Sequence, residues 1–175
     1  MFTDLELLQI KNCINRILHV PGNYTGGILE MALVVDYHIP KEELQSRCNA
    51  LLGMLKKQGD IFRNVRLNLI KWCGDTDIRK ELSAMAYVQM GQALADYESG
   101  ADGKSLEILF GQLKLFYARS KLVIVLTDGS FVTNDKKAAK EALQPFLSRK
   151  LLLLQGSECI PGSRMLMNLI KEEEE

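Results

Sequence analysis

Two stretches decide the fold: ILEMALVVD at residues 28–36 and KLVIVLTDGS at residues 121–130. Each is a nearly unbroken apolar run that ends at an aspartate, Asp36 in the first stretch and Asp128 in the second. An apolar run that does not alternate with polar residues is typical of a strand buried on both faces, as in a parallel sheet. The two stretches therefore predict buried strands of a mostly parallel sheet.

Helical patterns separate these strands. A helix is predicted from Pro40 to about Gln58, because Glu42 and Glu43 fall in its first turn, where the helix dipole favours acids. Three other helices and two more strands are predicted by the same reasoning. One helix follows the capping box Thr3-x-x-Glu6, a second spans Leu106 to Tyr117, and a third runs from Asn134 to Pro145. The two strands include Val65–Leu69 and Leu151–Leu154.

Two segments are harder to assign. The first part of Ile78–Tyr97 fits a short edge strand, whereas apolar residues from Leu82 to Tyr97 recur at a spacing that favours a helix. A terminal helix is predicted around Met165–Ile170, followed by a solvated acidic end.

The alternation of strands and helices predicts an α/β domain with a doubly wound, mostly parallel central sheet and helices on both faces. We expect a single domain over residues 1–175, with an N-terminal helix in 1–20, the α/β core in 28–170 and an acidic tail in 171–175.

Composition narrows the functional classes. The chain has 22 basic and 22 acidic residues among 175, so it has no general attraction to nucleic acid or to anionic membranes. Its longest apolar runs are far shorter than the ~20 residues of a membrane-spanning helix. The N-terminus lacks the basic start of a signal peptide, and the four cysteines are widely spaced. We expect a cytoplasmic protein with reduced, structural thiols.

The candidate site lies where the two apolar strands end. In open parallel sheets, binding sites form beyond the carboxyl ends of the strands, where strand order reverses. If the strands are neighbours, Asp36 and Asp128 project into one crevice, and paired carboxylates with nearby hydroxyls suit Mg²⁺ or Mn²⁺. The alternative is that each aspartate only caps the turn that follows it.

From about Ile28 to Leu154 the chain resembles the von Willebrand factor A-type domains. The segment 121–130, with its Thr-Asp-Gly ending, is similar to the fourth strand of that family. The strand that ends at Asp36 and leads into the Pro40 helix is similar to the first strand, and the order of elements also agrees. The resemblance implies a metal-ion-dependent adhesion site at Asp36 and Asp128, which in the family holds a divalent ion.

The chain departs from the family at the metal ligands. The family motif is Asp-x-Ser-x-Ser, whereas this sequence reads Asp36-Tyr37-His38-Ile39-Pro40 and lacks both hydroxyls. The family's threonine aligns with Ser105, which would supply a hydroxyl, or equally well with Lys104, which would supply a cation. The implied ligands are therefore Asp36, Asp128 and Ser105, with weak or absent dependence on Mg²⁺ or Mn²⁺. His38 suits transition metals better, but we expect it to be an exposed loop residue.

The resemblance implies a non-enzymatic module that binds another protein through the rim of the crevice. The expected contact residues are Tyr37, His38, Ser130 and Phe131, which flank the two aspartates in sequence. Intracellular relatives often act beside AAA-type ATPases or in larger assemblies, so a partner of that kind is implied. The alternative is a Mg²⁺-dependent phosphohydrolase that uses Asp36 and Asp128, although His38 stands where such an enzyme needs a second aspartate.

Overall fold

The computed structural model describes residues 3–18, 29–56, 65–75, 78–83, 94–100, 104–117, 120–146, 151–155 and 158–161. The fold is of the α/β class and is built on a sheet of six strands in the order β3-β2-β1-β5-β7-β8. These strands are β1 (Leu29–Asp36), β2 (Val65–Trp72), β3 (Ile78–Ser83), β5 (Leu122–Thr127), β7 (Leu151–Gln155) and β8 (Glu158–Pro161).

The four central strands, β2, β1, β5 and β7, are parallel, and both edge strands are antiparallel to their neighbours. In the central pair, Leu33 of β1 lies opposite Ile124 of β5. Strand order reverses between β1 and β5, since β2 and β3 lie beyond one and β7 and β8 beyond the other. The two apolar stretches of the sequence therefore form adjacent central strands, as a buried parallel pair requires.

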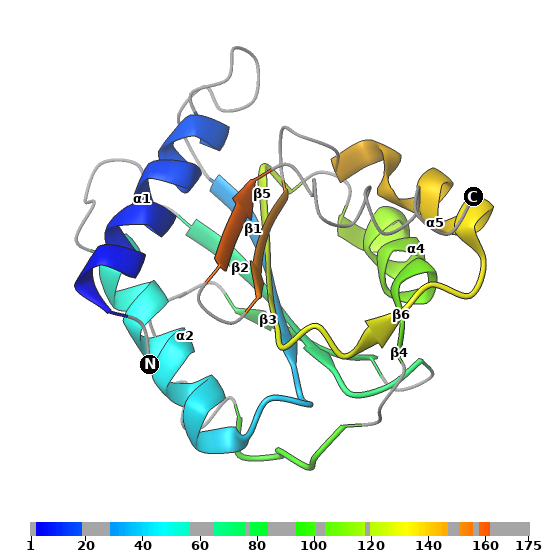
Figure 1. The fold of residues 1–175 in the computed structure, drawn as a ribbon, viewed down its shortest axis with the longest axis horizontal. Coiled ribbons are helices and arrows are strands. Elements are labelled where there is room, and N and C mark those ends of the chain that lie inside the picture. Colours follow the sequence, from blue (N-terminus) through cyan, green and yellow to red (C-terminus); the bar gives the residue numbers. More distant parts are fainter. Residues whose placement is uncertain are drawn as a thin grey trace.

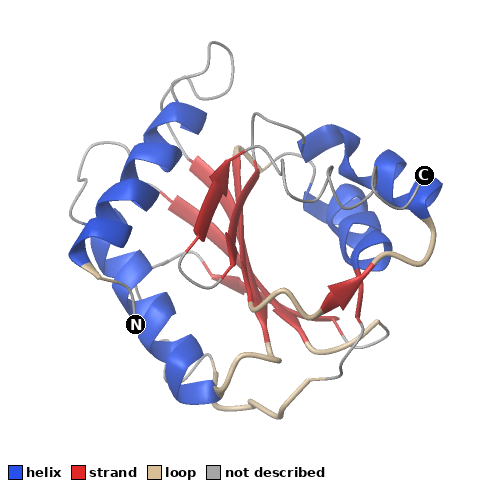
Figure 2. Cartoon of the chain, in the orientation of Figure 1, coloured by secondary structure: helices blue, strands red, loops and turns tan. Residues whose placement is uncertain are grey.

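Helices cover both faces of this sheet (Figures 1 and 2). One face carries α1 (Asp4–Leu18) and α2 (Lys41–Lys56), and the other carries α4 (Leu106–Tyr117) and α5 (Lys136–Leu143). Side chains alternate between the faces along each strand, so β1 contributes Leu33 to the core under α1 and α2, and Val34 to the core under α4 and α5. Both cores are needed to bury strands that are apolar on each face.

Local signals in the sequence explain where the helices begin and end. At α1 the amide of Glu6 donates to Thr3 Oγ1 (3.1 Å) and the amide of Thr3 donates to Glu6 Oε1 (3.0 Å), which confirms the capping box. Asp135 caps α5 by accepting a hydrogen bond from the amide of Ala138. The helix then ends in a 3₁₀ turn, Gln144–Phe146, that contains Pro145.

The structure corrects one predicted element and adds another, and one predicted region lies outside the described residues. The start of the Ile78–Tyr97 segment is the edge strand β3, so the helical interpretation is wrong for Leu82; residues 84–93 lie outside the described part of the chain. The antiparallel edge strand β8 has no counterpart in the prediction. The predicted terminal helix, Met165–Ile170, and the acidic tail also lie outside the described residues.

Three of the four cysteines, Cys13, Cys48 and Cys73, are buried and form no disulfide. Desolvation by burial raises the pKa of the Cys48 thiol to about 12, so this thiol is protonated and unreactive at neutral pH. Across the described ranges, no helix combines the length and the apolar character needed to cross a bilayer.

One close contact joins the segment 94–100 to the carboxyl ends of β1 and β2. The amide of Gly100 donates to the carbonyl oxygen of Tyr37, directly after β1, at 2.9 Å. A Cβ atom at position 100 would lie 2.9 Å from the carbonyl oxygen of Cys73, directly after β2. Only glycine allows this segment to approach the ends of both strands so closely.

We predict that Gly100→Ala lowers the free energy of unfolding by about 1–3 kcal/mol, because the added methyl group meets backbone atoms that cannot rotate away. Chemical denaturation monitored by circular dichroism measures the change. Gly53→Ala, in α2, is the control: a Cβ there has open space around it, and we expect a gain of about 0.5–1 kcal/mol from helix propensity. Equal effects of the two substitutions would contradict the packing argument.

Candidate functional site

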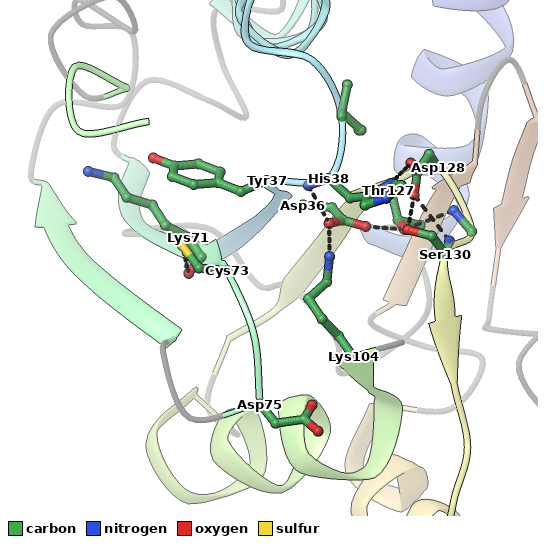
Figure 3. A network of polar contacts seen from close by, with 12 residues as sticks. Asp36, Tyr37, His38, Lys71, Cys73, Asp75, Lys104, Thr127, Asp128 and Ser130 are labelled. Carbon is green, nitrogen blue, oxygen red and sulfur yellow. Dashed lines mark hydrogen bonds and ion pairs between the residues drawn. The ribbon is translucent and has the colours of Figure 1, made fainter. Parts of the chain in front are cut away.

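Polar side chains gather at the carboxyl ends of β1 and β5 (Figure 3). Asp36 is the last residue of β1, Thr127 is the last residue of β5, and Asp128 follows it. The hydroxyl of Thr127 donates to Asp36 Oδ2 at 2.7 Å. The site therefore lies at the reversal of strand order, where a parallel sheet leaves room for it.

Asp36 is completely buried, and its carboxylate is engaged by groups of the chain itself. In addition to Thr127, the amide of His38 donates to Asp36 Oδ1 at 2.9 Å, and the ammonium group of Lys104 forms an ion pair with the same oxygen. Both partners in this ion pair have a side-chain exposure of 0%. A buried carboxylate is tolerated when a cation and hydrogen-bond donors replace the water that it has lost.

Lys104 reaches Asp36 from a small second sheet. Strand β4 (Lys104–Ser105) pairs in parallel with β6 (Phe131–Val132) just before α4 begins. The backbone amide of Ser105 donates to Asp75 Oδ1 at 2.5 Å, and its hydroxyl donates to Asp75 Oδ2 at 2.9 Å. These contacts hold β4 beside the turn that follows β2. They fix the point from which the Lys104 side chain extends.

Trp72 supports the same lysine. The ammonium nitrogen of Lys104 lies 4.8 Å from the centroid of the Trp72 ring, a cation–π distance. Trp72 is the last residue of β2 and pairs with Asp36 in the strand register. The indole is fully buried, and its centroid is 6.1 Å from that of Phe131. The cation is therefore enclosed by a carboxylate and an aromatic face.

A more accessible group of polar residues forms the rim, which we define as His38, Asp128 and Ser130. His38 Nδ1 contacts Asp128 Oδ2, and the hydroxyl of Ser130 donates to Asp128 Oδ1 at 2.6 Å. Side-chain exposure is 30% for His38 and 34% for Asp128. Partial burial by itself raises the pKa of Asp128, but the hydrogen bonds from Ser130 and His38 outweigh it, so the pKa is below its usual value.

The structure corrects the expectation that Tyr37 is a surface contact. Tyr37 is completely buried, because the segment 94–100 packs over it. Its hydroxyl donates to Asp96 Oδ1 at 2.9 Å, and its ring centroid is 4.8 Å from that of Tyr97. The hydroxyl of Tyr97 donates in turn to the carbonyl oxygen of Tyr37 at 3.0 Å. Tyr37 is thus a core residue that positions the loop after β1.

Phe131 is intermediate between surface and core. It is half-buried and packs against the core that contains Trp72, so only part of the ring faces outward. The next residue, Val132, is 41% exposed. The accessible apolar surface beside the rim is therefore formed by both residues of β6.

Ser105 does not join Asp36 and Asp128. Besides donating to Asp75, its hydroxyl accepts a hydrogen bond from the side-chain amide of Asn134 at 2.9 Å. The neighbouring residue Lys104 is the one whose side chain contacts Asp36. Of the three residues predicted as metal ligands, Asp36 and Asp128 lie near one another, joined through His38, and Ser105 belongs to a separate network.

The residues around Asp36 do not fit a resident Mg²⁺ or Mn²⁺ ion. The Lys104 ammonium pairs with one oxygen of Asp36, and both oxygens of Asp128 have partners within the rim. Positions 38 and 40 are His38 and Pro40, so neither of them offers a hydroxyl to an ion. Within the described ranges, no group of three His, Cys, Asp or Glu side chains could hold a metal ion. This donor set is suited to an ammonium group instead of a divalent cation.

Sequence reasoning missed Asp75 and Asp96. Asp75 follows β2 at the same edge of the sheet as Asp36, and this topological signal could have identified it. Asp96 joins Tyr37 to Lys71, whose ammonium nitrogen is 3.2 Å from Asp96 Oδ1. It lies in a segment distant in sequence from both partners, and no local pattern points to it.

Comparison with known proteins gives no assignment for this arrangement. No family model matches the chain, and no curated protein shows significant sequence similarity to it.

We predict that Lys104→Met lowers the free energy of unfolding by about 3–5 kcal/mol, because it leaves the buried carboxylate of Asp36 without its cation. The double variant Asp36→Asn, Lys104→Met should recover most of this loss, since no unpaired charge remains. Denaturant unfolding of both variants and of Asp36→Asn measures the coupling.

Lys71→Met is the matched control. Lys71 is also a buried lysine, but its partner Asp96 is 40% exposed, so water can solvate the carboxylate that remains. We expect a loss of about 1 kcal/mol. An equal loss at both positions, or additive effects of Asp36→Asn and Lys104→Met, would contradict the proposed coupling.

The lowered pKa of Asp128 predicts that the free energy of unfolding decreases at acidic pH. The folded state favours the ionised carboxylate, so this contribution is complete above the unfolded pKa of about 3.9 and is lost as the pH falls through the lower, folded value. We therefore expect the stability difference between the unaltered chain and Asp128→Asn to shrink from about pH 5 to about pH 2. Denaturant unfolding at several pH values measures it; a constant difference would show that Asp128 is not stabilised as an anion.

Proposed function

We propose that this chain is a non-enzymatic protein-interaction module of the von Willebrand factor A type, with a doubly wound sheet, that binds its partner without a divalent ion. The order of strands and helices and the Asp36 and Thr127-Asp128-Gly129 strand endings support the class. The proposal includes the cytoplasmic location that the sequence predicts.

A single observation carries the proposal: the fully buried ion pair between Lys104 and Asp36. In metal-binding members of the family, the carboxylate of a partner completes the coordination of the ion. Here the cation belongs to the chain and is closed off from solvent, so a partner cannot reach it. Recognition is therefore assigned to the groups that lie above the ion pair.

The proposed contact surface consists of the rim together with the β6 residues Phe131 and Val132. The rim offers a histidine, a carboxylate and a hydroxyl, each partly exposed, and Val132 adds apolar area. A combination of polar groups and neighbouring apolar area is common in protein interfaces. Tyr37 is not part of this surface, because it is buried.

The phosphohydrolase alternative receives less support. A nucleophilic aspartate must be reachable by its substrate, whereas both oxygens of Asp36 are buried and engaged by Lys104, Thr127 and His38. Mg²⁺-dependent hydrolysis of a phosphate monoester that disappears in Asp36→Asn would favour the enzyme over the binding module.

We predict that millimolar Mg²⁺ or Mn²⁺ does not raise the thermal unfolding midpoint above its value in EDTA. A functional site at 100 times its dissociation constant would add about 2.7 kcal/mol, or roughly 5–10 °C for a chain of this size. Asp128→Ala measured in parallel identifies the site of any shift. A shift in the unaltered chain that is absent in Asp128→Ala would establish a metal site and contradict the proposal.

We predict that a partner retained by the immobilised chain is lost from Asp128→Lys, which reverses the charge of the rim. Retention should be equal in EDTA and in Mg²⁺, because no ion bridges the contact. Quantitative affinity capture from the source cells measures the difference, and an AAA-type ATPase or a component of a larger assembly is the partner class to examine first.

Glu141→Lys is the control for this experiment. Glu141 is an exposed residue of α5, and its substitution changes the net charge by the same amount away from the rim. We expect partner retention by this variant. Equal retention by Asp128→Lys, or retention only in Mg²⁺, would contradict the proposed mode of binding.

A further inference from the structure

The most unusual feature of the chain is a charged pair held entirely out of water. Burying an ammonium and a carboxylate is costly because both lose their hydration, and proteins with apolar residues in place of such a pair are often equally stable. Lys104 and Asp36 nevertheless form this pair at the junction of three chain segments that are distant in sequence. A contact with this cost implies a specific structural role for the cation.

We infer that the Lys104 ammonium is a tethered cation that extends from β4 into an intramolecular cation site at the ends of β1, β2 and β5. The site is expected to bind a small cation, and the cation that fits it best is a primary alkylammonium ion, the chemical form of a lysine side chain. The inference goes beyond the proposed function, since it holds whether or not the rim binds a partner.

The surroundings of the ammonium group support a site built for a cation. The carboxylate of Asp36, through Oδ1, supplies a negative charge, and the face of Trp72 supplies the negative region of its quadrupole. Thr127 holds the other oxygen of the carboxylate, which fixes the orientation of Asp36. These partners come from the ends of β1, β2 and β5, so the cation links the three strand ends. Figure 3 shows Lys104 extending toward Asp36, with Thr127 beside it.

The path of the lysine is also determined by the fold. Asp75 holds the backbone and hydroxyl of Ser105, and β6 pairs with β4. Because adjacent residues of an extended strand point to opposite sides, anchoring Ser105 at Asp75 directs Lys104 away from Asp75 and toward Asp36. The hydrogen bonds around Asp75 therefore position the ammonium group of Lys104 in its site.

Truncation of the lysine tests the inference. Lys104→Ala removes three methylene groups and the ammonium, which together correspond to n-propylammonium. We expect Lys104→Ala to have a lower unfolding midpoint, and added n-propylammonium to raise that midpoint by about 3 °C or more at roughly ten times its dissociation constant. If Lys104→Ala is unfolded alone, recovery of native near-ultraviolet circular dichroism on addition of n-propylammonium is the equivalent result.

Three controls isolate the charge. 1-Propanol has the same chain length without the charge and should give no rescue. The double variant Asp36→Asn, Lys104→Ala lacks the anion and should not respond to n-propylammonium. The unaltered chain should not respond either, because its site is filled. Equal effects of n-propylammonium and 1-propanol, or no effect of either on Lys104→Ala, would overturn the inference.

A measurement on the unaltered chain keeps the inference testable if the variant cannot fold under any condition. The Lys104 ammonium protons should exchange slowly enough to give a side-chain ¹⁵N–¹H resonance, and this resonance should be unchanged by Mg²⁺. Lys71→Met distinguishes it from the signal of Lys71, which is the other buried lysine among the residues that the structure describes. An ammonium resonance lost to rapid exchange, or displaced by Mg²⁺, would overturn the inference without bearing on partner binding by the rim.

Discussion

The ion pair between Asp36 and Lys104 is the interaction on which the functional end of this fold depends. Both groups are fully buried, so each must obtain from the protein what water would otherwise supply. The carboxylate does so through the hydroxyl of Thr127 and the amide of His38 as well as the ammonium. The positions of three parts of the chain therefore depend on one another: the ends of β1 and β5, the loop after β1, and strand β4. Displacement of any of them leaves a buried charge without one of its partners.

This constraint separates a closed interior from an accessible rim. Lys104 and Asp36 neutralise each other below the surface, whereas His38, Asp128 and Ser130 form their own network above it. His38 belongs to both layers, because its amide contacts Asp36 and its ring contacts Asp128. The electrostatic character of the rim is consequently determined by the rim residues, with little contribution from the neutralised pair beneath them.

Much of the fold could be predicted because its strongest signals are local. The apolar runs of β1 and β5, the capping box of α1 and Pro145 after α5 each act within a few residues. The start of the Ile78–Tyr97 segment was less clear, since Leu82 fits both a helical spacing and a strand. The segment forms a strand because it pairs with β2. This pairing is a tertiary contact, which the local periodicity of the sequence does not reveal.

The candidate site was predicted only in part, for a similar physical reason. Asp36 and Asp128 were identified because topology alone places the ends of neighbouring parallel strands together. The choice between Lys104 and Ser105 depends on a register of one residue, and a shift of one residue in a strand exchanges the side chains on its two sides. Asp75, which settles that register, lies 30 residues away from Ser105. Tyr37 was misjudged because the covering segment 94–100 is likewise distant in sequence.

A tethered cation also differs from a bound ion in its thermodynamics. A divalent ion fills its site to an extent that depends on its concentration, so a module that requires one can be switched by ion supply. An ammonium on the chain has no such dependence: once β4 is in place, its occupancy follows from folding. In the proposed binding mode, any control of the interaction must then act on the rim. There, the contact between His38 and Asp128 links the loops that follow β1 and β5, and both of its side chains are partly exposed to solvent.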